Sequence, residues 1–64
     1  IQLNGETYAL SETLSVAGLI EHLQLAGRRV AVELNFEIVP RNVYETTFIK
    51  DGDAVEIVHA IGGG

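Results

Sequence analysis

The apolar residues of the chain recur with two different periods, and these periods predict its secondary structure. In IQLNGETYAL, Ile1 and Leu3 alternate with Gln2, and Tyr8 and Leu10 continue a second strand. Asn4-Gly5 between them is the strongest short signal for a two-residue hairpin turn. The next apolar residues follow the helical spacing i, i+3, i+4 and i+7: Val16, Leu19, Ile20 and Leu23. The sequence therefore predicts a β-hairpin over residues 1–10, followed by an amphipathic helix.

Three residues bear on where this helix begins and ends. Ser15 precedes the first apolar position, and its hydroxyl is expected to accept a hydrogen bond from an unpaired amide of the first turn. Gly27 follows the last good helix former and is predicted to end the helix in a left-handed conformation. Gly18 costs about 1 kcal/mol in a helix relative to Ala. It either lets the helix approach a strand closely or is simply tolerated.

Extended structure is predicted to return after the helix. A strand is expected to carry Val30, Val32 and Leu34 on one face, and Ala31 and Glu33 on the other. Asn35 marks a bend, and Pro40 ends a short strand of residues 38–39. Residues 42–49 show no clear period, so we expect a short helical turn or a loop there.

The last strand is predicted to follow the turn at residues 51–53 and to cover residues 54–61. The order β-β-α-β-β-turn-β indicates one domain of the α+β class, with one helix covering one face of a small mixed sheet. By analogy at the level of the fold, parallel pairing of the first and last strands in the middle of the sheet would make this a ubiquitin-like β-grasp fold.

The composition excludes some classes of partner. The formal net charge is −5, whereas a protein that binds a nucleic-acid backbone needs clustered Lys and Arg, and the only basic cluster is Arg28-Arg29. No apolar run approaches the roughly 20 residues of a membrane span. There is no cysteine for a disulfide, a thiolate ligand or a nucleophile. We therefore expect a cytoplasmic protein with neither nucleic acid nor membrane as a partner.

Few side chains are candidates for catalysis or metal binding. We expect a structural or solvated role for His22 on the helix, while His59 near the end of the last strand could meet a partner. Asp51, Asp53 and Glu56 could suggest a metal, but Asp-Gly-Asp commonly forms a turn, and a calcium loop needs more oxygen ligands at fixed spacing. The sequence predicts neither a catalytic residue of its own nor a metal site.

Three glycines end the sequence and call for an explanation other than packing. Gly62, Gly63 and Gly64 order at high entropic cost and contribute no side chain. They do not form a phosphate-binding P-loop, because no Lys-Ser/Thr and no helix follow them. They would instead present the α-carboxylate of Gly64 on a thin arm. We therefore expect residues 1–61 to form the domain and residues 62–64 a flexible tail.

Several segments resemble the ThiS family, the small sulfur carriers of thiamine biosynthesis. The resemblance covers essentially the whole chain and is carried by SVAGLIEHL, LNFEIVPR and KDGDAVEIVHAIGGG. The stretch Asn-x-Glu-Ile-Val-Pro-Arg, together with Asp-Gly-Asp and the terminal glycines, is more specific than either part alone. Two positions depart from the family pattern: Gly18 stands where a helix former such as Glu is common, and Phe36 occupies a bend position that is often small or polar.

This resemblance implies a β-grasp protein that serves as a co-substrate and is not itself an enzyme. A ThiF-like, E1-like adenylyltransferase would use ATP to adenylate the carboxylate of Gly64. A sulfur donor such as a cysteine desulfurase would then replace AMP and leave a thiocarboxylate. A ThiG-like thiazole synthase, a (β/α)-barrel enzyme, would accept that sulfur while building the thiazole ring. The carrier itself would bind no cofactor.

The partner enzymes must also contact the folded body of the carrier. If Val55 and Ile57 point into the core, alternation sends Glu56, Val58 and Ala60 to the other face of the sheet. Val58 and Ala60, with Ala31 on a neighbouring strand, would form a modest apolar patch beside the tail, rimmed by Glu33 and Glu56. We expect this patch to be the docking face. The alternative is an ordinary mixed sheet surface, which single exposed apolar residues do not contradict.

Other functions stay open at the level of the sequence. The glycine tail would equally suit a sulfur carrier for molybdopterin synthesis or a ubiquitin-like modifier. A β-grasp binding module without terminal chemistry is a further alternative. Arg41 could pair with an acid of a partner or form a cap or salt bridge within the chain. The length and the segment NFEIVPR favour the thiamine pathway.

Overall fold

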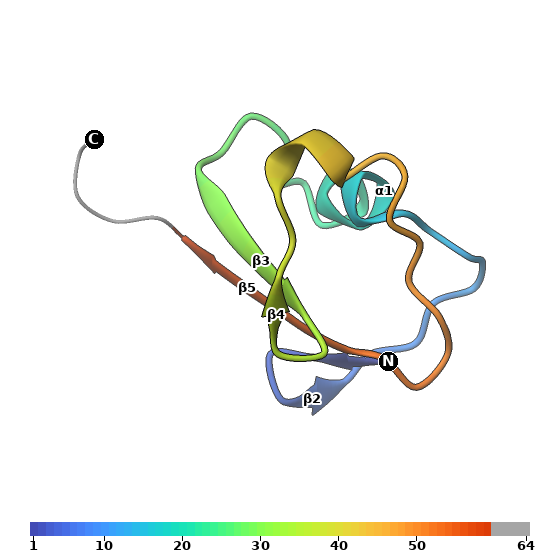
Figure 1. Cartoon of the computed structure of the whole chain (residues 1–64). Helices are drawn as coiled ribbons and strands as arrows, with labels where there is room; N and C mark the ends of the chain where they lie inside the picture. Colours follow the sequence, from blue (N-terminus) through green and yellow to red (C-terminus); the bar gives the residue numbers. More distant parts are fainter. Residues whose placement is uncertain (60–64) are drawn as a thin grey trace.

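The structure is a computed structural model, and it describes residues 1–59. These residues form a five-stranded mixed sheet and one α-helix (Figure 1). The strands are β1 (Gln2–Leu3), β2 (Glu6–Thr7), β3 (Val30–Leu34), β4 (Glu37–Ile38) and β5 (Ala54–His59). The helix α1 (Val16–His22) follows β2, and a short 3₁₀ helix, η1 (Arg41–Val43), follows β4. This is the predicted order of elements, with η1 in the segment that lacked a clear period.

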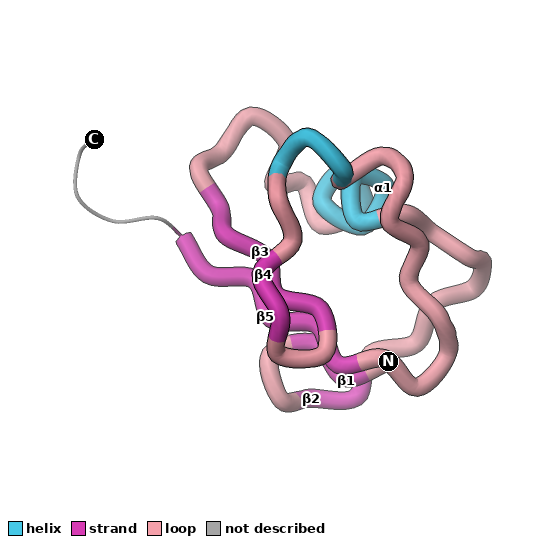
Figure 2. The backbone as a smooth tube through the Cα atoms, viewed as in Figure 1, coloured by secondary structure: helices cyan, strands magenta, loops and turns pink. Residues whose placement is uncertain are grey.

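The strand order in the sheet is β2-β1-β5-β3-β4, so the last strand lies at its centre (Figure 2). β1 runs parallel to β5, with Gln2 opposite Ala54 and Leu3 opposite Val55. β3 runs antiparallel to β5 over all five of its residues, from Val30 opposite His59 to Leu34 opposite Val55. The expected parallel pairing of the first and last strands is therefore confirmed, and the fold is a β-grasp.

The first hairpin has the predicted turn but a shorter second strand. Asn4 and Gly5 have φ of 52° and 83°, the left-handed values that a type I′ turn requires at both positions. The second strand ends at Thr7, and two further bonds join Tyr8 to Ile1. The Tyr8 amide donates to the Ile1 carbonyl at 2.9 Å, and the Ile1 amino group donates to the Tyr8 carbonyl at 3.1 Å. Leu10 was predicted to lie in this strand, but it lies outside it. It packs against the core, because the chain has already left the sheet edge on its way to α1.

The start of α1 is as predicted, and its end is not. The Ser15 Oγ accepts a hydrogen bond from the Gly18 amide at 3.0 Å, which confirms Ser15 as the N-cap. The helix ends at His22, before Gly27. The left-handed residue is Gln24, with φ of 62°, and the amides of Gln24 and Leu25 donate to the carbonyls of Glu21 and Ile20. This is a Schellman motif, so the prediction that Gly27 ends the helix was wrong.

Gly18 is tolerated in α1 and does not serve a close contact with a strand. A Cβ placed on it would lie 3.4 Å from the Leu14 Cδ2 and 3.5 Å from the Ser15 Oγ, both of which belong to the entry into the helix itself. The sequence left two explanations for Gly18 open, and the structure supports the one in which the glycine is simply tolerated in the helix.

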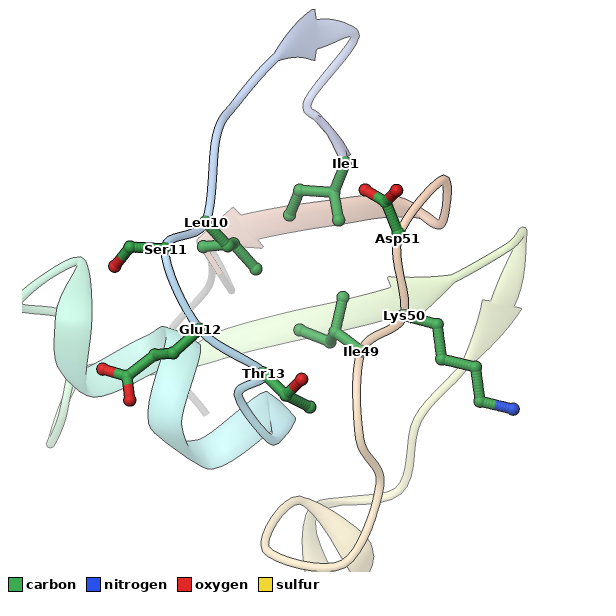
Figure 3. A pocket seen from close by; sticks show the side chains of 8 residues that line it. All are labelled: Ile1, Leu10, Ser11, Glu12, Thr13, Ile49, Lys50 and Asp51. Carbon is green, nitrogen blue, oxygen red and sulfur yellow. The ribbon is translucent and has the colours of Figure 1, made fainter.

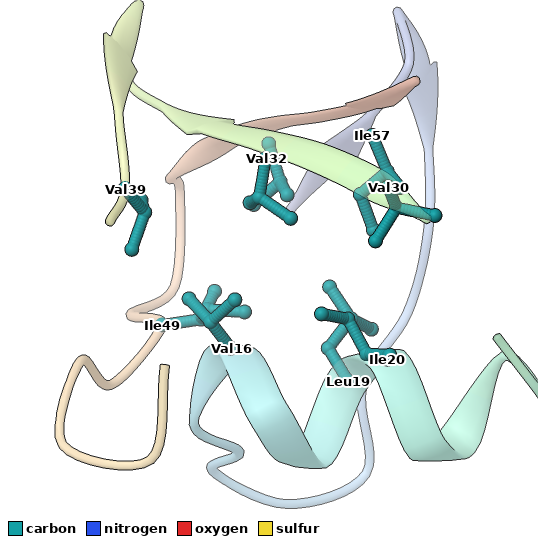
Figure 4. Packing of buried hydrophobic residues seen from close by; sticks show 9 residues of the cluster. Val16, Leu19, Ile20, Val30, Val32, Val39, Ile49 and Ile57 are labelled. Atoms are coloured by element: carbon teal, nitrogen blue, oxygen red, sulfur yellow. The ribbon is translucent and has the colours of Figure 1, made fainter. Parts of the chain in front are cut away.

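The core lies between α1 and one face of the sheet (Figure 4). The helix contributes Val16, Leu19 and Ile20, and β3 and β5 contribute alternate residues, as a period of two requires. The buried residues are Val16, Leu19, Ile20, Val30, Val32, Val39, Ile49, Val55 and Ile57. The opposite face of the sheet has no element packed on it within residues 1–59. In that same part of the chain, no helix has the length and apolar character needed to span a membrane.

Candidate functional site

Strand β5 leads to the predicted tail from the centre of the sheet. Its side chains alternate as expected: Val55 and Ile57 are buried, whereas Glu56 and Val58 are exposed. Five residues of β3 pair with β5, and β1 holds its other edge. β1 pairs only with the start of β5, at Ala54 and Val55, whereas β3 pairs with β5 as far as His59, the last described residue. Ala60 and Gly62–Gly64, which were predicted to belong to the site, lie outside the described residues.

The uncovered face of the sheet carries a mixed apolar and acidic surface. Ala31 lies directly opposite Val58, and Glu33 lies directly opposite Glu56. Ile38 lies opposite Glu33 on the other side and is 74% exposed. We call this surface the outer face, defined by Ala31, Glu33, Ile38, Glu56 and Val58. The structure thus brings together the predicted residues Ala31, Glu56 and Val58.

The arrangement of the acids within the outer face could not be derived from the sequence. Glu33 and Glu56 face each other across β3 and β5, so their Cβ atoms are about 5 Å apart. They form a row beside the Ala31–Val58 pair, where a rim around it was expected. Neither carboxylate has an ion-pair partner among residues 1–59. Like charges directly opposite each other destabilise a sheet, and a cation from another molecule would relieve this.

Ile38 was missed as a surface residue by the sequence analysis. In the sequence it stands next to Val39 in a short apolar pair, and two residues do not reveal which of them points inward. In the structure Val39 is buried and Ile38 is exposed, because the Val39 amide bonds to the Val32 carbonyl at 2.9 Å and places both valines on the core side. The exposure of Ile38 follows only when two facts are combined: Pro40 ends the strand, and β4 pairs with β3.

The predicted turn at residues 51–53 has a structural role. The Asp53 carboxylate accepts a hydrogen bond from the Lys50 amide at 2.7 Å and another from the Asn35 Nδ2 at 3.1 Å. The hydrogen bond from the Lys50 backbone, and then that from Asn35, lower the pKa of Asp53 below its usual value, because both stabilise the ionised form. No group of three or more His, Cys, Asp or Glu side chains able to hold a metal occurs among residues 1–59.

The two histidines lie on different elements of the fold, His22 on α1 and His59 on β5. His22, exposed at the end of α1, makes an edge-on contact with the ring of Tyr8, at 6.2 Å between centroids. His59 is exposed at the end of β5, opposite Val30. Within residues 1–59, neither is paired with a carboxylate that could orient it for proton transfer.

Three arginines gather at the end of the sheet where β5 ends. Arg28 and Arg29, from the loop before β3, line one hollow together with Arg41 and Tyr44. The floor includes Val30, which lies opposite His59. The sequence showed Arg28-Arg29 as a cluster, but only the fold adds Arg41 to it. Arg41 has no ion-pair partner among residues 1–59, so the salt bridge considered for it within the chain is not formed there.

A second hollow lies between the N-terminal segment and the loop that precedes β5 (Figure 3). Ile1, Leu10 and Ile49 point into it, whereas the charged ends of Glu12 and Lys50 point outward. A reactive site needs polar groups that converge on one point. In this hollow the side chains that point inward are apolar, and Glu12 and Lys50 turn their charged ends away from one another.

Comparison with known proteins agrees with this geometry. The model of the ThiS family matches residues 1–64. The sulfur carrier protein ThiS of Bacillus subtilis is 37% identical over 65 residues, a match that covers 100% of this chain and 98% of that protein. The crystal structure of the thiamine biosynthesis protein ThiS from Geobacter metallireducens has a TM-score of 0.86 at 39% identity, and covers 98% of this chain and 96% of that one.

A different kind of relative is a thiazole synthase of Paramagnetospirillum magneticum. It is 45% identical over 62 residues, which is 97% of this chain but only 19% of that protein. A segment similar to this chain therefore forms a minor part of a much longer polypeptide.

The fold and the uncovered sheet face define a β-grasp protein of the ubiquitin-like kind, with its last strand at the centre of the sheet. The family match over the whole chain makes the assignment more specific. The chain belongs to the ThiS family, the sulfur carriers of thiamine biosynthesis.

Proposed function

We propose that this ThiS-family chain carries sulfur as a thiocarboxylate on Gly64. A ThiF-like, E1-like adenylyltransferase would join the Gly64 carboxylate to the AMP part of ATP and release pyrophosphate. Sulfide, released by a thiol reductant from the persulfide of a donor such as a cysteine desulfurase, would attack the carbonyl carbon, form the C–S bond and expel AMP. The observation that carries this proposal is the match of the ThiS family to residues 1–64.

The chemistry explains why a tail of glycines suits this task. A carboxylate is a poor acylating group, and adenylation supplies a good leaving group. To react, the terminus must enter a narrow pocket of another protein, where a Cβ would meet the walls; glycine has none and accepts dihedrals closed to other residues. Gly63 and Gly64 would enter the pocket, and Gly62 would connect them to the body.

We further propose that the chain is a co-substrate and that its partner enzymes supply the catalytic groups. In residues 1–59 the histidines are not paired with a carboxylate, and in the hollow of Figure 3 the charged ends of Glu12 and Lys50 point away from each other. The body of the carrier would then serve for recognition only. ATP and the sulfur donor would act at the activating enzyme, and the carrier would hold neither as a cofactor.

The outer face is the proposed docking surface for these enzymes. Val58 is 57% exposed and lies opposite Ala31, two residues before Ala60 and close to the base of the tail. The carboxylates of Glu33 and Glu56 lie beside this pair and are not neutralised within residues 1–59. A partner with a small apolar contact area next to an Arg or Lys would complement both features. Ala60 would extend the apolar part toward the tail.

A ThiG-like thiazole synthase is the proposed acceptor of the sulfur. The thiazole synthase of Paramagnetospirillum magneticum contains a segment 45% identical to this chain within one longer polypeptide. Covalent linkage of two parts raises their effective concentration, so linked parts commonly act together. The same logic supports association of the separate proteins here, in the cytoplasm where both would be made.

The experiment that tests the proposal is a mass measurement after incubation with an E1-like activating enzyme, ATP and a sulfur source. We expect one oxygen of Gly64 to be replaced by sulfur, and this sulfur to be lost when purified thiazole synthase and its substrates are added. A variant that lacks Gly63 and Gly64 is the control, and should unfold at the same urea concentration as the parent but stay unloaded.

Three results would contradict the proposal in different ways. An unchanged mass with an activating enzyme shown to be competent would indicate a binding module without terminal chemistry. Loading followed by transfer only to a molybdopterin synthase, or by attachment to lysines of other proteins, would indicate another carrier or a ubiquitin-like modifier. Failure of the shortened variant to fold would show that the tail is structural.

A further inference from the structure

The turn between β3 and β4 contains an aromatic residue in an unfavourable backbone conformation. Leu34 pairs with Glu37, so the turn consists of Asn35 and Phe36 alone. Their φ values are 51° and 69°, both in the left-handed region that a type I′ turn requires. Asn tolerates this region, but for a bulky side chain such as Phe it is a genuine outlier.

The chain itself provides the comparison for this turn. The β1–β2 hairpin has the same two-residue turn with the same Asn at its first position, and there the second residue is Gly5, with φ of 83°. Asn-Gly is the favoured pair for this geometry. The β3–β4 turn therefore differs from the β1–β2 turn only at its second residue, which is Phe36 in place of Gly5.

Phe36 has little burial within residues 1–59 that would offset this strain. Its side chain is 81% exposed, the highest value among the large apolar residues of the described chain. Asn35, in contrast, is explained by the fold, because its Oδ1 accepts from the Ala54 amide at 2.9 Å and its Nδ2 donates to the Asp53 carboxylate at 3.1 Å. Strain that the folded state does not require points to a function outside the fold.

The surroundings of Phe36 indicate what kind of surface would receive it. Ile38, two residues further on in the same hairpin, is 74% exposed and belongs to the outer face. Glu37 is exposed between them, and Glu33 is directly opposite Ile38. The hairpin thus presents two large apolar side chains accompanied by carboxylates that have no ion-pair partner among residues 1–59.

We propose that Phe36 is an anchor residue that inserts into an apolar socket, bordered by Lys or Arg, on a partner enzyme. This rests on the proposed function, since the partner is an enzyme that receives the tail. The turn lies at the start of β5, where Asn35 contacts Ala54, and the six residues of β5 span roughly 17 Å to His59. The anchor therefore acts in recognition, at a distance from the reacting carboxylate.

The test separates binding from stability, because Phe36→Gly is expected to weaken binding to the partner and to stabilise the fold. Phe36→Gly restores the Asn-Gly turn, so the urea midpoint of unfolding should rise. The dissociation constant for the partner enzyme, or the KM for the carrier, should increase roughly tenfold or more with kcat unchanged, the loss typical of truncating an aromatic interface anchor. Phe36→Tyr keeps the aromatic ring and should keep the affinity.

Gly5→Phe is the matched control at the other hairpin. It places a Phe in the same turn position, with φ of 83°, at the opposite edge of the sheet. It should lower the urea midpoint and leave the affinity for the partner unchanged. If it weakened binding as much as Phe36→Gly, the effect would not belong to the β3–β4 turn and the proposal would be wrong.

Binding is measured with the activating enzyme and with the thiazole synthase separately, by a direct method that needs no chemistry. A tenfold loss of affinity for either enzyme supports the proposal. Equal affinity of parent and Phe36→Gly for both enzymes overturns it, while the loading of the parent at Gly64, measured by mass, reports on the proposed function independently. A lower urea midpoint for Phe36→Gly would show a structural role and would also overturn it.

Discussion

At the scale of single residues, two asparagine side chains tie both hairpins to the central strand. The Asn4 Oδ1 accepts from the Ile57 amide at 2.8 Å, and the Asn35 Oδ1 accepts from the Ala54 amide at 2.9 Å. Each Asn therefore has a second task besides tolerating the left-handed conformation of its turn. Asp53 completes the second contact, because it accepts from Asn35 and from the Lys50 amide.

The lowered pKa of Asp53 predicts a loss of stability in acid. Because the pKa is lower in the folded state than in the unfolded chain, at about 3.9, the ionised carboxylate stabilises the fold above that value. This contribution is lost as the pH falls through the lower folded-state pKa. The free energy of unfolding, measured by urea titration at a series of pH values, should therefore fall less steeply in acid for Asp53→Asn than for the parent.

Asp51→Asn is the control for this measurement. Asp51 lies in the same exposed turn, but its side chain makes no hydrogen bond within the described residues. This variant should follow the pH dependence of the parent. Identical acid profiles for the parent and Asp53→Asn would show that the bonds from Lys50 and Asn35 do not distinguish the two protonation states.

At the scale of the elements, the end of α1 depends on a residue that is poorly suited to its conformation. Gln24 has φ of 62° at the position after the C-cap Leu23, where Gly is the usual residue. The two bonds of the Schellman motif, from the amides of Gln24 and Leu25, satisfy carbonyls of the last turn. Leu25 also packs against the core, so burial helps to hold this unfavourable conformation.

Gln24→Gly should stabilise the protein by about 0.5–1 kcal/mol. A left-handed conformation costs a residue with a Cβ roughly 1–2 kcal/mol, and part of this gain is lost because Gly has more freedom in the unfolded chain. Urea unfolding measures the change. Gly27→Ala is the opposite control, because Gly27 has φ of 82° and an added Cβ should destabilise the loop. A destabilised Gln24→Gly would mean that the Gln side chain contributes contacts that outweigh the strain.

At the scale of the whole molecule, the two faces of the sheet differ in what covers them and in the side chains they present. One face is covered by α1 and contributes the alternate residues of β3 and β5 to the core (Figure 4). The other face has no covering element within residues 1–59 and presents Val58 and Ala31 beside two opposed carboxylates. In a chain with a net charge of −5, this face is suited to a partner that is basic where it meets the sheet.

Val58→Glu should weaken docking of the carrier to its activating enzyme. The substitution replaces an apolar contact by a third carboxylate next to Glu56 and Glu33, which a partner would have to desolvate. We expect the KM for the carrier to rise roughly tenfold, which corresponds to about 1.4 kcal/mol. Ala9→Glu is the matched control, because it adds the same charge at an exposed position outside the sheet. Unchanged transfer kinetics for Val58→Glu would remove the outer face from the docking surface.

Much of the local structure could be predicted from the sequence, because its signals are local. The spacing of Val16, Leu19 and Ile20 requires only one turn of helix to be recognised, and the cap at Ser15 lies next to it. The alternation in β5 likewise placed Val55 and Ile57 in the core before any partner strand was known. The Asn4-Gly5 turn needed no tertiary contact either, because the pair itself tolerates the left-handed values.

The tertiary structure decided the features that depend on residues far apart in the chain. Only the register of β3 against β5 and β4 places Glu33 opposite Glu56 and Ile38 on the outer face. Only the packing of the loops brings Arg41 to the Arg28-Arg29 pair. A period of two or 3.6 states which side of an element is buried, but not which element covers it. Which element covers which is decided by how much apolar surface the whole molecule buries, and a short segment contributes too little of this surface to show the arrangement.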